Sequence, residues 1–186
     1  MQLILGILSL TLLLGCTPKS ESATIITNSK AQKETSMFGF LIEKETKKYV
    51  IASPLSGVLM KGGKPLINTK IVRRLTWNGN DSGILQEFMT DRKGAFSIPI
   101  HEEILTLSGI TEFVASNALF VNEETEESLF WYSPKRQEEL YSDTGGILEG
   151  MICDLDAEDE RRDTTEFSAV LTKCTWENMH NTNLKR

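Results

Sequence analysis

The sequence predicts a mainly β protein, a β-sandwich of about seven to nine strands with one or two short helical turns. Short runs of β-branched and aromatic residues recur between Gly, Pro, Asn and Asp, and Ser56–Ile98 holds several of them. Gly62-Gly63 can supply the positive φ of a tight turn, and Asp91 with Gly94 frames a second turn. Two linked hairpins are therefore expected, and the sequence shows no long amphipathic helix and no internal repeat.

Other elements are expected on either side of this stretch. Met37–Ile42 and Lys48–Ala52 predict a first hairpin around Glu43–Lys47, or an edge strand leading into the sandwich. The short helical turns are expected at Glu102–Leu107 and Pro134–Leu140.

The first fifteen residues indicate an export signal. Met1–Gly15 has no charge and many Leu and Ile residues, a run too short to span a bilayer comfortably but typical of a secretory signal. It ends Leu-Leu-Gly-Cys, which resembles a bacterial lipobox, so we expect residues 1–15 to be removed and Cys16 to be lipidated. Thr17, rather than Asp, follows and predicts an outer-membrane lipoprotein facing the periplasm. The alternative is an apolar start with a chance cysteine, which the lack of Lys or Arg near Met1 favours.

One folded domain is expected after the anchor. Residues 16–36 are rich in Ser, Thr, Lys and Gln and predict a flexible tether behind the lipidated cysteine. Residues 37–176 are expected to form the sandwich, because a chain of this size buries roughly 70% of its unfolded surface in one core. Residues 177–186 form a polar C-terminal tail.

Two motifs carry a resemblance to known domains. The pattern SGVL-x-x-x-GKPL at Ser56–Leu66 and T-D-x-x-G-x-F at Thr90–Phe96 resembles the transthyretin-like, carboxypeptidase regulatory-domain class of β-sandwich. More narrowly, it is similar to the bacterial domains of unknown function DUF6795, in which LFWY at Leu129–Tyr132 and CDL at Cys153–Leu155 are also expected. The resemblance covers roughly Met37–Trp176. It implies a transthyretin-like or Ig-like sandwich and supplies no catalytic residue.

The cysteines fit an exported protein. With Cys16 lipidated, Cys153 and Cys174 remain as a pair in two apolar, strand-like runs. In an oxidising periplasm we expect a disulfide between them, which contributes about 3 kcal/mol in the chain-entropy model. The alternative is two buried free thiols.

The charges are unevenly distributed along the chain. Residues 17–101 contain 13 Lys and Arg against 7 Asp and Glu, whereas residues 102–186 contain 7 against 19. The carboxylates gather at an expected hairpin tip and in the loop between the cysteine runs. The tip holds Glu123, Glu124, Glu126 and Glu127, and the loop holds Asp154, Asp156, Glu158, Asp159, Glu160 and Asp163.

These acidic clusters allow three interpretations. They can keep an exported domain soluble, dock a basic protein partner, or, at Asp154, Asp156 and Glu158, bind calcium. The run lacks the Gly and the terminal Glu of an EF-hand loop, which disfavours calcium. The net charge of −6 disfavours nucleic acid. Lys70, Arg73 and Arg74 are expected on a solvated strand face.

Aromatic residues supply the remaining binding candidates. Phe130-Trp131-Tyr132 is apolar on both faces of a strand and is either core or shared between core and surface. Trp77 ends a strand before Asn78–Gly83, which is expected to be an exposed loop, and exposed Trp or Tyr residues anchor protein interfaces. The partner-binding candidates are Trp77, Asn80, Asp81, Glu123, Glu124, Glu126, Glu127, Tyr132, Asp156, Glu158, Asp159 and Glu160.

No catalytic motif is present in the sequence. There is no Gly-x-Ser-x-Gly elbow, no His-Glu-x-x-His and no glycine-rich phosphate loop, and only His101 and His180 could act as imidazole bases. We expect a protein without catalytic residues, metal or cofactor.

The expected function is therefore binding. A small, acidic, lipid-anchored, disulfide-closed domain suits the immunity protein of an antibacterial toxin, of the type VI secretion kind, with the toxin encoded by a neighbouring gene. The alternatives are a structural or accessory envelope lipoprotein and a carbohydrate- or small-ligand-binding module.

Overall fold

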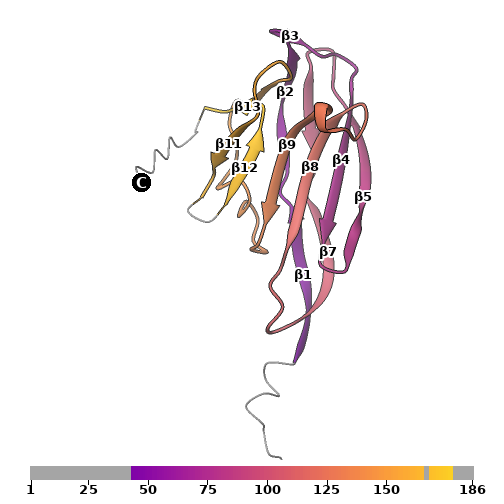
Figure 1. Cartoon of the computed structure of the whole chain (residues 1–186), viewed down its shortest axis with the longest axis vertical. Helices are drawn as coiled ribbons and strands as arrows, with labels where there is room; N and C mark the ends of the chain where they lie inside the picture. Colours follow the sequence, from indigo (N-terminus) through magenta and orange to yellow (C-terminus); the bar gives the residue numbers. More distant parts are fainter. Residues whose placement is uncertain (1–42, 166–167, 178–186) are drawn as a thin grey trace, which may run out of the picture. The chain divides into compact units, whose positions relative to one another are not determined.

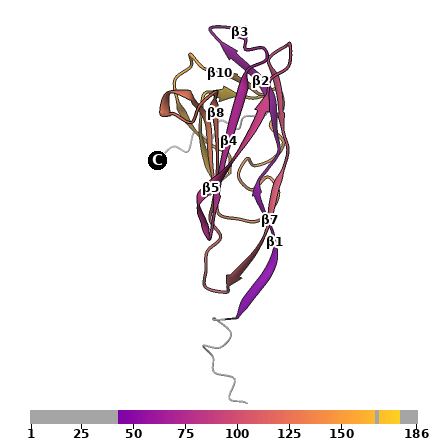
Figure 2. The ribbon, with the colours of Figure 1, turned by 90° about the vertical axis from the view of Figure 1, so that its right-hand side faces the viewer.

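The computed structural model describes residues 43–165 and 168–177. Among these residues it contains thirteen strands and a single 3-10 turn, so the mainly β prediction is confirmed. One layer is a six-stranded sheet in the order β11-β12-β9-β8-β4-β5, and the other contains the β1-β7 ribbon and a five-stranded sheet around β2 (Figures 1 and 2). The two layers form a β-sandwich-like arrangement.

The bounds of the elements are as follows: β1 Lys44–Ala52, β2 Leu55–Lys61, β3 Lys64–Pro65, β4 Lys70–Trp77, β5 Asn80–Met89, β6 Ala95–Ile98, β7 His101–Ser108, β8 Ala115–Val121, η1 Glu126–Ser128, β9 Leu129–Lys135, β10 Ile152–Asp154, β11 Glu160–Asp163, β12 Ala169–Thr172 and β13 Cys174–Thr175.

Seven of these strands have seven or more residues, and the others have two to four. The long strands match the expected number. Among the short ones, β10, β12 and β13 fall in the two apolar, strand-like runs that hold Cys153 and Cys174.

Several local predictions were wrong. Glu102–Leu107 lies in β7 rather than in a helical turn, because it pairs along its whole length with β1. Pro134 and Lys135 end β9, and the single 3-10 turn of the described residues lies instead at Glu126–Ser128. The hairpin around Glu43–Lys47 is replaced by the continuous strand β1, as the edge-strand alternative proposed.

The expected turns are present, but one of them has a different role. Gly62 and Gly63, with φ of 57° and 73°, close the β2–β3 hairpin, and these values favour glycine. The turn between Asp91 and Gly94 joins β5 to β6, which belong to opposite layers. It is therefore a corner between the sheets rather than a hairpin.

Two apolar clusters join the layers. The larger one packs β2, β6 and the disulfide against the end of the six-stranded sheet that holds Ile71 and Val121. The second packs Tyr49 and Ile51 of β1 against the other end, around Trp77. Arg73 points between the layers and is fully buried, which corrects the prediction of a solvated face there. Its guanidinium donates to Gln86 Oε1 and Pro99 O, and burial lowers the pKa of Arg73 to about 10.

A disulfide joins Cys153 and Cys174, as predicted. The two residues face each other on neighbouring antiparallel strands, β10 and β13. Both are buried in the larger apolar cluster, where the cystine packs as an apolar side chain. The bridge holds the C-terminal strands on the second layer.

Asp154 directly follows Cys153 and fixes the β2–β3 turn. Its carboxylate oxygens accept hydrogen bonds from Gly62 N (3.0 Å), Gly63 N (3.1 Å) and Asp156 N (3.1 Å). The N–H groups, that of Asp156 first, hold the pKa of Asp154 below its ordinary value of 3.8. The calcium interpretation named this carboxylate as a ligand, and in the structure both of its oxygens serve the turn.

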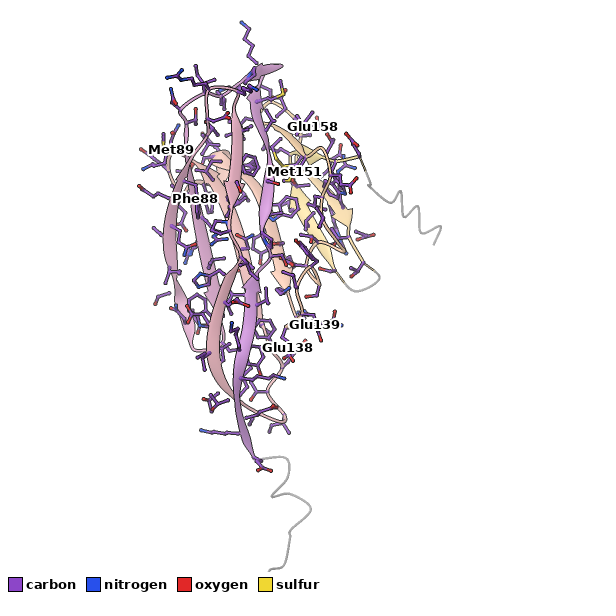
Figure 3. The ribbon with its side chains drawn as sticks, turned by 180° about the vertical axis from the view of Figure 1, so that it is seen from behind. Phe88, Met89, Glu138, Glu139, Met151 and Glu158 are labelled. Atoms are coloured by element: carbon purple, nitrogen blue, oxygen red, sulfur yellow. A yellow bond between two sulfur atoms is a disulfide. The ribbon has the colours of Figure 1, made fainter. Side chains whose placement is uncertain are left out.

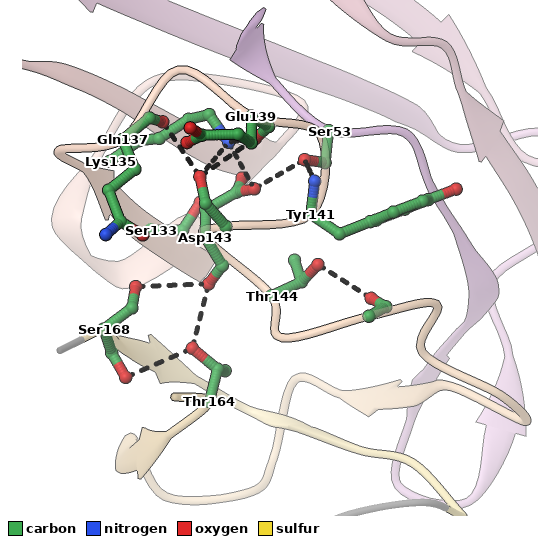
Figure 4. A network of polar contacts seen from close by, with 12 residues as sticks. Ser53, Ser133, Lys135, Gln137, Glu139, Tyr141, Asp143, Thr144, Thr164 and Ser168 are labelled. Atoms are coloured by element: carbon green, nitrogen blue, oxygen red, sulfur yellow. Dashed lines mark hydrogen bonds and ion pairs between the residues drawn. The ribbon is translucent and has the colours of Figure 1, made fainter. Parts of the chain in front are cut away.

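A buried ion pair fastens the segment that follows β9 (Figure 4). The side chains of Lys135 and Asp143 are 1% and 2% exposed, with Nζ and Oδ1 3.0 Å apart. Lys135 also donates to Glu139 O and Ser142 Oγ, both at 2.7 Å, and Ser53 donates to Asp143 Oδ1 at 2.5 Å. Burial lowers the pKa of Lys135, and Asp143 partly offsets this effect. Through the hydrogen bond from Ser53, which lies between β1 and β2, the pair also ties residues 136–144 to that turn.

Removing one partner of this pair should be costly. Asp143→Ala should lower the free energy of unfolding by about 3 to 5 kcal/mol, because it leaves a buried ammonium without its counter-charge. Lys135→Met with Asp143→Ala should cost less than Asp143→Ala alone. Glu102→Ala, which breaks the exposed pair with Lys48, is the control and should cost at most about 1 kcal/mol. Urea unfolding measures the free energy of unfolding of the wild type and the three variants. A double variant that is less stable than Asp143→Ala would contradict this account.

The hydrogen bonds of the Asp154 carboxylate, here called the Asp154 cap, should make the stability of the fold depend on pH in the acidic range. A carboxylate with a lowered folded pKa stabilises the fold above its unfolded pKa of about 3.9, and this contribution is lost as pH falls through the folded pKa. The difference in urea midpoint between the wild type and Asp154→Ala should therefore be larger at about pH 7 than at about pH 3. Glu158→Ala, an exposed neighbour, should differ little from the wild type at either pH. An equal Asp154→Ala difference at both values would count against the cap.

Candidate functional site

Trp77 does not belong to a binding surface, contrary to the prediction. Its side chain points between the layers, is 9% exposed and lies 5.7 Å from the His101 ring, centroid to centroid. The expected loop Asn78–Gly83 is absent, because Asn78 and Gly79 alone form the turn and β5 begins at Asn80. Asn78 is tied to the chain before β8, since its Oδ1 accepts from Val114 N at 2.7 Å.

The other candidates separate into two groups along the six-stranded sheet. Asn80 and Asp81 lie at the β4–β5 turn, beside the start of β8, and Asp81 is exposed. Glu123–Glu127 follow the far end of β8, a strand of seven residues that spans roughly 20 Å. Asn80 and Asp81 therefore lie apart from Glu123–Glu127, at the opposite end of β8.

Both acidic clusters lie at one end of this sheet, a point that the sequence left open. Glu123–Glu127 precede β9, and β12 pairs with β9 through Thr172 and Trp131 near its start. Glu160, which belongs to the second cluster, pairs with Thr172. The strand register thus brings Asp156–Glu160 to the same end as Glu123–Glu127.

Some of these carboxylates are neutralised and others are not. Arg74 pairs with Glu124, Lys173 with Asp159 at 3.8 Å, and Arg162 with Glu160 at 2.5 Å. Within the two acidic clusters, the exposed carboxylates that have no ion pair with any described residue are Glu123, Glu126, Glu127, Asp156 and Glu158.

The segment Glu123–Glu127, here called the acidic loop, is held in one conformation by its own hydrogen bonds. Asn122, with φ of 64°, turns the chain out of β8, and its N–H donates to Lys70 O at 2.9 Å. Thr125 N donates to Ser128 Oγ at 3.1 Å, and Ser128 Oγ in turn bonds the carbonyls of Glu123 and Thr125. A loop ordered before binding loses little conformational entropy when it binds.

A β-bulge decides which β9 side chains reach the surface. The register with β8 shifts between Leu119 and Phe120, so that Phe120 faces Leu129 and Leu119 faces Trp131. The extra residue, Phe130, and Trp131 are both fully buried, whereas Tyr132 is 39% exposed on the outer face. This answers the question of how three consecutive aromatic residues are shared between core and surface.

Next to Tyr132, the outer face of the sheet carries a small apolar cluster and a pocket. Val72, Ala118 and Phe120 form the cluster with Leu129 packed against it. The pocket has a volume of about 240 Å³, which is room for roughly one large side chain. We call it the outer pocket; it is lined by Arg74, Thr76, Ser116, Ala118, Phe120, Glu124, Leu129 and Tyr132.

The outer pocket brings together two of the predicted residues, Tyr132 and Glu124. The ion pair between Arg74 and Glu124 forms part of its wall, so the acidic loop and the pocket form one continuous surface. Sequence reasoning missed Phe120, Leu129 and Arg74. The alternation of apolar and polar residues in β4 and β8 could have indicated which side chains share a face. It does not say which of the two faces points outward.

His101 is part of a structural network rather than an open site. Its side chain is 15% exposed; Nδ1 lies 3.3 Å from Gln86 Nε2 and Nε2 lies 3.0 Å from Glu103 Oε1. Because Gln86 Oε1 accepts from Arg73, its Nε2 donates to His101 Nδ1, and the ring then carries its proton on Nε2. The chain of contacts connects the buried guanidinium to the surface.

Neither a metal centre nor a membrane helix is found in the part of the chain that the structure describes. No three His, Cys, Asp or Glu residues there are grouped as ligands, and no helix there is long and apolar enough to cross a bilayer. The predicted signal peptide, Cys16 and the tether lie outside the described residues, as does His180.

The fold and the outer pocket can be compared with known proteins. No curated protein and no solved structure matches the chain, so the closer assignment to the transthyretin-like class stays a prediction. Residues 55–158, more than half of the 186 residues, match the family described as a domain of unknown function, DUF6795. The match runs from β2 through the acidic loop into the second acidic cluster, as far as Glu158, and includes the outer pocket. The chain belongs to the DUF6795 family.

Proposed function

We propose that this protein binds a basic protein partner without catalysing a reaction, and that the partner lies on the outer pocket and the acidic loop. The observation that carries the proposal is the junction of an apolar pocket with unpaired carboxylates on one ordered loop. Glu123, Glu126 and Glu127 supply the charge, and Tyr132 supplies an exposed aromatic ring. Interfaces use this combination of an anchoring pocket and a charged border.

The two parts of this surface have different roles in binding. A large side chain of the partner enters the outer pocket beside Tyr132 and Phe120, and most of the affinity comes from this buried contact. The carboxylates of the acidic loop attract the basic surface around that anchor and raise the rate of association. Binding to a fixed loop also limits the entropy lost by the protein.

In the cell, this binding neutralises a toxin. The protein is an outer-membrane lipoprotein tethered through Cys16, and it acts as an immunity protein against an antibacterial, type VI secretion-like toxin encoded by a neighbouring gene. The lipobox-like Leu-Leu-Gly-Cys and the buried disulfide support an oxidising envelope compartment. A lipid anchor keeps the protein where an incoming toxin acts.

Two substitutions should separate the anchor from the charge. With the neighbouring gene's product as ligand, Tyr132→Ala should weaken the affinity about tenfold or more, mainly by faster dissociation. Glu126→Lys should mainly slow association, and this effect should shrink at high salt. Surface plasmon resonance measures both rates.

The matched controls lie at the other end of the domain. Ile110→Ala removes a side chain that is 70% exposed, and Asp81→Lys makes the same charge change as Glu126→Lys. Neither should alter binding. The proposal is wrong if the neighbouring product does not bind, or if the controls weaken binding as much as the outer-pocket variants do. Deletion that weakens the envelope without exposing cells to killing by siblings would favour the structural role instead.

A further inference from the structure

A larger groove lies at the opposite end of β8 and β9 from the acidic loop. It has a volume of about 840 Å³, within the range of binding sites for short peptides and small ligands. Three segments form it: Glu43 with the first half of β1, residues 107–113 from the end of β7 into the loop before β8, and residues 136–139 after β9. Figure 3 shows Glu138 and Glu139 beside β1, well separated from Glu158.

The floor of this groove is aromatic. Tyr49 of β1 and Phe113 pack with their ring centroids 4.9 Å apart, and Leu107 borders them. Both rings are held by the apolar cluster around Trp77, so the floor is rigid. The two rings are 4% and 7% exposed, and Lys47 Nζ lies 5.2 Å from the centroid of the Tyr49 ring, so this packed aromatic floor already holds one cation.

The charged groups at the rim leave an excess of carboxylates. Lys47 Nζ is 2.7 Å from Glu138 Oε1, and Arg136 pairs with Glu112 at 2.8 Å. Lys47 and Arg136 therefore already have a counter-charge, and the hydrogen bond that Lys47 donates to Glu138 raises the pKa of Lys47. Lys44, the third cation that lines the groove, has no ion pair with any described residue. Glu43 and Glu139 also line the groove and have no ion pair with any described residue.

One edge of β1 is open along this groove. β1 pairs with β7 on one side. On the other side, Val50 N donates to Glu138 O at 3.3 Å. Within the described residues, no strand continues this pairing from Lys48 back to Lys44. The unpaired backbone groups of such an edge can hydrogen-bond an extended peptide.

We propose that this groove binds an extended peptide segment through an arginine side chain, with the peptide backbone alongside the free edge of β1. The arginine side chain enters the groove, and its guanidinium pairs with Glu43 or Glu139. An acidic peptide is disfavoured, because five glutamates line the groove against three cations, Lys44, Lys47 and Arg136. This site is separate from the outer pocket, so it does not depend on the proposed function.

The test uses a capped arginine-containing peptide as the probe and the isotope-labelled full domain. Titration followed by amide NMR should give saturable shifts at Lys47, Thr111 and Glu138. Glu43→Lys with Glu139→Lys should weaken the measured Kd by about tenfold or more. Gln137→Trp, which fills the groove without changing the charge, should also abolish the shifts.

The control for charge is Glu126→Lys with Glu127→Lys, which changes the net charge equally but leaves the groove intact. It should keep the wild-type Kd. Shifts that do not saturate, shifts centred on the acidic loop, or equal binding of a peptide with glutamate in place of arginine would each overturn the proposal. So would a Gln137→Trp domain that binds the arginine peptide as the wild type does.

Discussion

The β-bulge at Phe130 and Trp131 is the constraint on which the arrangement of both faces depends. By burying two consecutive aromatic rings, it fills the space between the layers around the disulfide and changes the direction of every later side chain in β9. Tyr132 consequently points outward and Lys135 inward. Without the extra residue, β9 would present the opposite set of side chains to solvent. The outer pocket and the buried pair of Lys135 with Asp143 are thus two consequences of one irregularity.

The two ends of the sandwich differ in how they are closed. At the end with the acidic clusters, the disulfide, the Asp154 cap and the hydrogen bonds of the acidic loop hold the chain in place. At the other end, β1 and β7 form a two-stranded ribbon that pairs with no further strand among residues 43–165 and 168–177, and Val50 N donates to Glu138 O of the segment after β9. The first end therefore offers a rigid surface, and the second offers a groove beside a free strand edge. These are different modes of recognition, an anchor in a preformed pocket and an added strand.

The fold class was predictable because it rests on local signals. Strand-length apolar runs, the Gly62-Gly63 turn and the two remaining cysteines each depend on few residues. The errors arose where a tertiary partner decided the outcome. Glu102–Leu107 is a strand because β1 lies beside it, and Asn78–Gly83 is mostly strand because β4 pairs with it. Trp77 was assigned to the surface because its neighbours in sequence are polar, although its side chain points into the sandwich.

The candidate site was predictable only in part. Composition identified the acidic loop and Tyr132, but not that Glu124, paired with Arg74, and Tyr132 line one pocket, since charge pairing between strands follows register. The groove gave no signal in the sequence, because its residues come from three distant segments.

Hydrogen exchange on the complex with the natural partner tests the central claim most directly. The account predicts that bound partner slows amide exchange in the acidic loop and in the first half of β9, where the outer pocket lies, and leaves the β4–β5 turn unchanged. Protection confined to the β4–β5 turn, or spread evenly over the domain, would contradict it.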